Sequence, residues 1–294
     1  MNGFLRVAPL AAALAAAAAC GGSTVEVGAY NGPDGGSPDS ASAPADGGVT
    51  PSGPKVHIHL RATGAPVAHA DGLSGQTPSD QRIGIRKLTM LTSAGDPAPM
   101  VVFDLGANAV EAGLNDKNDT VVASVPAATL KAGQYTVARV AISHVRYKVA
   151  ATMHAAGQHV PGVFSNLQVL SNGSSVDGAT FDKGHYKFSF EVGGSQLGGQ
   201  TGENGPLPQT PSGGGITLDT SGPESAYVFP INVPVDPTVK GDVHIVFELN
   251  THENFRWQEE ASPDYQTGVF DVTPTTFEPV KSFGANSFRV FAEL

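Results

Sequence analysis

From Lys55 onward, apolar and polar residues alternate one by one along several segments of the chain. KVHIHLRA (55–62) places Val56, Ile58 and Leu60 on one face and the polar side chains on the other. Successive side chains of a β-strand point to opposite faces of its sheet, so a period of two indicates a strand with one buried face. The same alternation predicts strands in HYKFSFEV (185–192), DVHIVFEL (242–249) and SFRVFAEL (287–294).

We expect about ten strands and no amphipathic helix, so the sequence predicts an all-β fold, an antiparallel β-sandwich or jelly roll. The long run QYTVARVAISHVRYKVA changes phase near Arg139 and Val140, which predicts a bulge or a bend between sheets. The glycine-rich segment 193–215 is expected to be a flexible loop within one body, 55–294. The other expected strands are 82–92, 100–105, 120–125, 134–149, 163–170, 226–233 and 268–272.

The charge of the chain argues against one class of partner. The formal net charge is −10, with 17 Lys and Arg against 27 Asp and Glu, and the basic residues do not cluster. Nucleic-acid binding needs clustered positive charge to contact phosphates. We therefore expect no nucleic-acid partner.

The single cysteine, Cys20, follows a short apolar run rich in alanine (MNGFLRVAPLAAALAAAAAC). This run is too short to span a bilayer and suits the apolar region of a signal peptide. Ala17-Ala18-Ala19-Cys20 resembles the lipobox of bacterial lipoproteins, although Ala17 stands where leucine is usual. The resemblance implies that residues 1–19 are removed and that Cys20 carries the lipid. An ordinary signal peptide cut at Ala17-Ala18-Ala19 is the alternative.

Residues 20–54 consist mostly of Gly, Pro, Ser, Ala and Asp, a composition that predicts a disordered tether. As a random coil, such a tether spans on the order of 30 Å. In lipoproteins of Gram-negative bacteria, Asp after the lipidated cysteine retains the protein in the inner membrane. Gly21 occupies that position here, so the resemblance implies the outer membrane or the cell surface.

A second resemblance concerns the segment AATLKAGQYTVARVAISHVRY. Leu130, Ala132, Gly133 and Tyr135 match a turn that leads into a β-sandwich strand in uncharacterised envelope lipoproteins of bacteria. This resemblance supports the fold and implies no activity.

The nine histidines are candidate metal ligands. On a strand, His57 and His59 project to the same face about 7 Å apart, and imidazole suits copper or zinc. His144, His185 and His244 are expected on polar faces and could join them, whereas His69, His154 and His159 are expected in loops. The alternative is that these histidines are simply solvated.

Three other segments contain residues that could form a site. In the loop THENFRWQEEASPDY (251–265), Trp257, Phe255 and Tyr265 could form a glycan- or peptide-binding surface. The alternative is that Trp257 packs over one end of the sandwich. LNDKNDT (114–120) lacks the spacing of a calcium loop and is expected to be a turn. The sequence around Ser195 lacks the G-x-S-x-G pattern, and no motif predicts a catalytic residue.

These observations leave three functions open. The first is a non-enzymatic binding or structural module, anchored to the membrane through lipid on Cys20, that has an envelope protein or a glycan as its partner and needs no cofactor. The second is a periplasmic protein that binds copper or zinc through His57 and His59. The third, a glycan-acting enzyme, has no motif in its favour.

Overall fold

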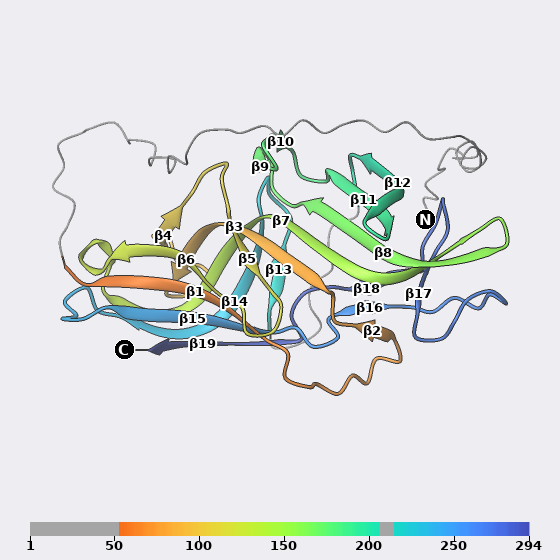
Figure 1. Cartoon of the computed structure of the whole chain (residues 1–294). Helices are drawn as coiled ribbons and strands as arrows, with labels where there is room; N and C mark the ends of the chain where they lie inside the picture. Colours follow the sequence, from red (N-terminus) through yellow and green to blue (C-terminus); the bar gives the residue numbers. More distant parts are fainter. Residues whose placement is uncertain (1–52, 206–214, 294) are drawn as a thin grey trace, which may run out of the picture. The chain divides into compact units, whose positions relative to one another are not determined.

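The computed structural model describes residues 53–205 and 215–293 (Figure 1). These residues form an all-β structure of packed sheets with one short 3-10 turn, η1 (Ala127–Thr129), which confirms the predicted all-β sandwich. No helix in this part of the chain is long and apolar enough to cross a membrane. The predicted signal peptide, Cys20 and nearly all of the predicted tether lie outside the described residues.

The strands form three sheets and a small hairpin. The four-stranded sheet contains β1 (Lys55–Thr63), β6 (Asp119–Pro126), β15 (Val243–Asn250) and β19 (Ser287–Glu293). The large sheet contains β3 (Asp80–Leu91), β4 (Met100–Asp104), β5 (Val110–Gly113), β7 (Gly133–Ala155), β8 (Gln158–Val169), β11 (Tyr186–Val192), β12 (Ser195–Gly202), β13 (Thr217–Asp219), β14 (Ser225–Val235) and β17 (Phe270–Val272). The small sheet contains β2 (Ser74–Gln76), β16 (Phe255–Trp257) and β18 (Val280–Ser282), and the hairpin joins β9 (Ser174–Val176) to β10 (Ala179–Phe181).

Strand β1 lies inside the four-stranded sheet, between β6 and β15. It runs antiparallel to β6 but parallel to β15, although β15 is far away in the sequence (Figure 1). The apolar residues of β1 face the large sheet and are at most 6% exposed, as the alternation predicts. The polar residues of β1 therefore lie on the outer face of this sheet.

Strand β7, with 23 residues, is the longest strand and carries two hydrophobic cores. β14 pairs with its first half, β3 with its middle from Val137 to Lys148, β8 with its second half, and β17 near its end. The buried positions change phase between Ile142 and Val145, where the β3–β7 pairing skips Ser143. The predicted bulge therefore exists but lies three residues beyond Val140, where Gly84 of β3 leaves room for the ring of His144.

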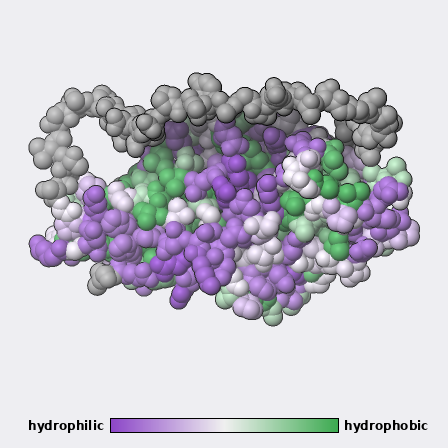
Figure 2. Space-filling model, viewed as in Figure 1, coloured by the Kyte–Doolittle hydropathy of each residue, from purple (hydrophilic) through white to green (hydrophobic). Residues whose placement is uncertain are grey.

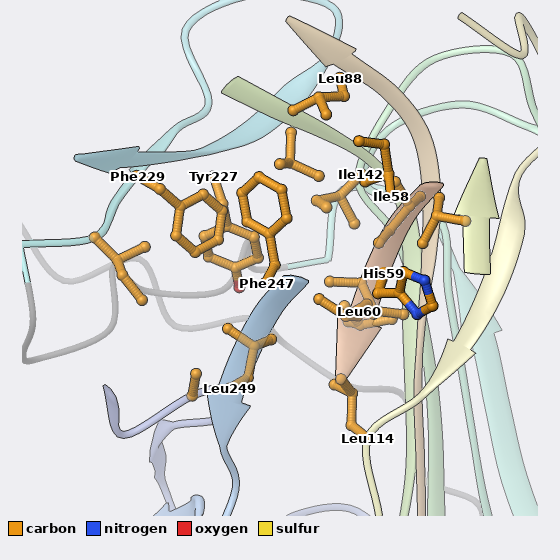
Figure 3. Close-up of a pocket in the computed structure, with 18 of the residues that line it drawn as sticks. Ile58, His59, Leu60, Leu88, Leu114, Ile142, Tyr227, Phe229, Phe247 and Leu249 are labelled. Atoms are coloured by element: carbon orange, nitrogen blue, oxygen red, sulfur yellow. The ribbon is translucent and has the colours of Figure 1, made fainter. Parts of the chain in front are cut away.

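The first core fills the space between the four-stranded sheet and the first half of β7 with its neighbours. Phe247 of β15 packs edge-to-face on Phe229 of β14, with ring centroids 5.8 Å apart. These rings line a cavity of about 50 Å³ whose lining is almost entirely apolar. Figure 3 shows Phe229 and Phe247 among its lining side chains. Ligand pockets usually measure about 300–1,000 Å³, so this cavity is a packing defect of the core rather than a binding site.

The second core lies between the far half of β7 and the small sheet. Phe255 and Trp257 of β16 are fully buried there with Phe270 of β17, at centroid distances of 5.0–5.7 Å. Aromatic rings supply much of the apolar area of this core.

The segment 193–215 differs from its prediction as a flexible loop. Ser195–Gly202 forms β12, which pairs with β11 as an edge strand of the large sheet. Glycines favour turns, but they do not prevent the backbone from pairing with a neighbouring strand. Here the close approach of Gly199 to the backbone of β11 leaves no room for a side chain, and residues 206–214 lie outside the described residues.

Candidate functional site

The outer face of the four-stranded sheet carries a cluster of polar side chains. The parallel pairing of β1 with β15 places His244 directly opposite His57. On the other side of β1, β6 contributes Ser124 and Asp119. This region belongs to the hydrophilic surface at the lower left of Figure 2. We call the three imidazoles of His57, His59 and His244 the histidine face.

His244 lies between the two histidines of β1. Its ring stacks on His57 with centroids 4.8 Å apart and is tilted against His59 at 5.0 Å. Nε2 of His59 and Nδ1 of His244 are 2.8 Å apart, which is hydrogen-bond distance. The close imidazole pair is therefore His59–His244, from two strands, rather than the predicted pair His57–His59 within one strand.

A carboxylate fixes the proton arrangement of this pair. Nδ1 of His59 lies 2.8 Å from Oδ1 of Asp119, and a carboxylate can only accept, so His59 donates from Nδ1. In neutral His59 the lone pair is then on Nε2, which accepts from Nδ1 of His244. Burial raises the pKa of Asp119, but hydrogen bonds from His59 and Arg61 outweigh this effect and hold it below its usual value.

His57 is held separately. Its Nδ1 lies 2.7 Å from Oγ of Ser124, and its Nε2 lies 3.4 Å from the carboxylate of Asp242. Hydrogen bonds from the backbone N–H of Lys55 and from His57 lower the pKa of Asp242. Both ring nitrogens of His57 thus have partners, and its contribution to the face is the stacking contact with His244.

The pair His59–His244 has the features of a metal-binding pair. Two imidazole nitrogens on one tetrahedral zinc, at about 2.0 Å each, lie about 3.3 Å apart, which is close to the 2.8 Å separation here. Metal-ligating histidines usually donate their other N–H to a carboxylate or carbonyl, as His59 does to Asp119. A metal ion bound to Nε2 of His59 and Nδ1 of His244 would require the proton on Nδ1 of His244 to move to Nε2 of the same ring.

The other histidines expected on polar faces do not join this cluster. His144 is 3% exposed and pairs with Glu111, its Nε2 lying 2.8 Å from the carboxylate. Burial lowers the pKa of His144. His185 directly precedes β11, stacks on Phe181 and bonds to Glu203. Both histidines therefore have local structural roles.

The predicted aromatic binding surface is not formed as expected. Trp257 and Phe255 are completely buried in the second core, so neither ring can stack on a ligand at the surface. Tyr265 is partly exposed and packs on His154 at 4.9 Å. The sequence contains no signal that separates a surface tryptophan from a core one when it lies near charged residues.

One group of potential ligands was missed. His69, expected in a loop, lies near His252 and Glu253, with one ligand atom from each within 4.8 Å of the others. Nothing in the sequence groups His252 and Glu253 with His69, because His69 is 183 positions away from His252. Only the tertiary structure brings these three residues together.

The histidine face is the feature from which a function can be argued. A binding site can be argued from the geometry and chemistry of its residues, whereas an all-β fold by itself hosts many functions. No protein-family model matches the chain, and no curated protein or solved structure is significantly similar to it.

Proposed function

We propose that this chain is a lipid-anchored protein of the bacterial cell envelope whose β-sandwich is a non-enzymatic binding module. The ligand is a transition-metal ion, copper or zinc, held on the histidine face. The observation that carries this proposal is the 2.8 Å approach of His59 to His244, with Asp119 behind His59. The anchor rests on the resemblance of Ala17-Ala18-Ala19-Cys20 to a lipobox.

Metal binding at this pair would be coupled to protons. To bind the metal through Nδ1, neutral His244 moves its one ring proton from Nδ1 to Nε2, so the neutral pair releases no net proton. Because an imidazole nitrogen binds a metal only when it carries no proton, binding weakens as the pH falls. Two imidazoles leave further coordination positions for water or for a donor on a partner. Such a site suits capture and transfer of a metal ion better than a closed structural role, because structural zinc sites usually have four protein ligands.

Native mass spectrometry tests both the lipid anchor and the metal site. The full-length protein is extracted from its own envelope in mild detergent and supplied with Cu²⁺. We expect a chain that starts at acylated Cys20 and retains copper. His59→Ala and His244→Ala should each retain one copper ion fewer, whereas the control His185→Gln, at a histidine that bonds to Glu203 outside the histidine face, should retain the same number. An unlipidated chain contradicts the anchor, and an unchanged copper count in both variants contradicts the metal site.

A further inference from the structure

A second group of metal-ligating side chains lies between two connections of the four-stranded sheet. The connection 64–73 from β1 to β2 carries His69, and the turn 251–254 from β15 to β16 carries His252 and Glu253. Asn250 donates from Nδ2 to the carbonyl of Ala65 at 2.8 Å, which holds the two connections together. The imidazoles of His69 and His252 are nearly parallel, at an interplanar angle of 10°.

The imidazole nitrogens of this group have few hydrogen-bond partners among the described residues. Nε2 of His69 is enclosed and has no hydrogen-bond partner among the described residues. His252 has only one side-chain hydrogen bond in the same part of the chain, a long one of 3.4 Å from the backbone N–H of Val67 to its Nδ1. A buried polar atom without a partner is costly, and a bound ion or water is one of the few explanations for it.

Glu253 completes the group with a carboxylate. Its backbone φ of 44° lies in the left-handed region, which a residue with a side chain seldom adopts. The backbone N–H of Glu253 donates to Oγ1 of Thr77 at 2.8 Å, which fixes this conformation. The carboxylate is 3.8 Å from Nη1 of Arg256, too far for a strong ion pair, so it is available to a cation.

A polar cavity of about 210 Å³ adjoins the group, and His69 lines it. Asn254 also lines this cavity; its side chain is buried, and its Oδ1 has no hydrogen-bond partner within the described part of the chain. The amide nitrogen of Asn254 is committed to Gln81 and to the carbonyl of Gly284. The cavity has space for several waters, each of which occupies about 30 Å³ in the liquid.

We propose that His69, His252 and Glu253 bind a zinc ion, independently of the histidine face. Two imidazoles and one carboxylate are a ligand set that zinc favours, with a fourth position left for water or a small ligand. That position would draw on the polar cavity, where the oxygen of Asn254 can hold a zinc-bound water through further water. The ion would also fasten the connection 64–73, most of whose residues are exposed, to the turn 251–254.

The test uses the full-length chain in detergent, with metals removed by a chelator. The background carries His59→Ala and His244→Ala, so that the histidine face no longer contributes. Zn²⁺ binding is then measured by equilibrium dialysis with elemental analysis. We expect one zinc ion per chain in this background and at least a tenfold loss of affinity after a further His69→Ala or Glu253→Gln. His185→Gln, added instead, should leave the affinity unchanged.

Hydrogen exchange supplies a second measurement that does not depend on stoichiometry. Zinc should slow the exchange of amides in 64–73 in the background protein but not after Glu253→Gln. A background protein that binds no zinc overturns the proposal, as does an affinity that neither His69→Ala nor Glu253→Gln changes. Either result leaves the histidine face untouched, because copper binding to His59 and His244 is measured on the otherwise unsubstituted chain.

Discussion

At the scale of single residues, Arg256 shows how a buried charge is balanced in this protein. Its side chain is 6% exposed and donates to both carboxylate oxygens of Asp71 and to the carbonyl of Leu73. The hydrogen bond from Arg256 lowers the pKa of Asp71 below its ordinary value of 3.8. The native state therefore favours ionised Asp71 more strongly than the unfolded chain does.

This arrangement predicts a pH-dependent effect of Asp71→Asn. Asp71 is 38% exposed, so solvent screens the pair, and we expect the free energy of unfolding at pH 7 to fall by about 1 kcal/mol. Because the native pKa is the lower one, the stabilisation is present above about pH 4 and is lost as the pH falls through the native pKa. Urea denaturation at pH 7, 5 and 3 should show the difference between wild type and variant narrowing at pH 3. A difference that is constant with pH contradicts this assignment.

At the scale of the elements, the bulge of β7 depends on Gly84 of β3. A Cβ at position 84 would lie 2.5 Å from Cε1 of His144. The ring cannot swing away easily, because Glu111 and Ser143 hold its two nitrogens at 2.8 Å and 3.1 Å. The glycine is therefore required by the close approach of this ring and not by backbone strain.

We expect Gly84→Ala to lower the free energy of unfolding by about 1–3 kcal/mol, the usual cost of overpacking. Gly241→Ala is the matched control, since a Cβ there meets nothing within 4 Å. In a double-mutant cycle measured by thermal and urea denaturation, His144→Ala should relieve much of the effect of Gly84→Ala. Independent, additive effects of the two substitutions would show that the ring is not the cause.

The strands themselves could be predicted from local sequence, but their partners could not. The alternation in 55–62 identifies β1 and its buried face because a period of two is a local property. The parallel pairing of β1 with β15, which brings His244 beside His59, depends on which strands meet in space. The same limit explains why the sequence does not group His69 with Glu253, and why it does not decide whether Trp257 lies at the surface or packs over one end of the sandwich.

At the scale of the whole molecule, β7 links the two hydrophobic cores through one continuous backbone. The loss of one core would leave half of β7 without its packing partners. The only tryptophan of the chain, Trp257, is in the second core and reports on that core alone. The described part of the chain should therefore unfold as one cooperative unit. Destabilising the first core should then also shift the unfolding transition that Trp257 reports.

Phe247→Ala in the first core tests this cooperativity. Truncating a buried phenylalanine usually costs about 3–5 kcal/mol. We expect the urea midpoint from Trp257 fluorescence to shift together with the midpoint from far-UV circular dichroism. If the fluorescence midpoint stays at its wild-type value while circular dichroism shows an earlier transition, the two cores are independent and the prediction is wrong.

The parallel pairing of β1 with β15 also delays the folding of the first core during synthesis. About 180 residues separate the end of β1 from the start of β15, so ribosomes that add about 5–20 residues per second need roughly 10–40 s to supply the partner strand. Until then the apolar face of β1 lacks β15 beside it, and the first core cannot close. A nascent chain that stays open for this long can still be threaded through a secretion channel before it folds.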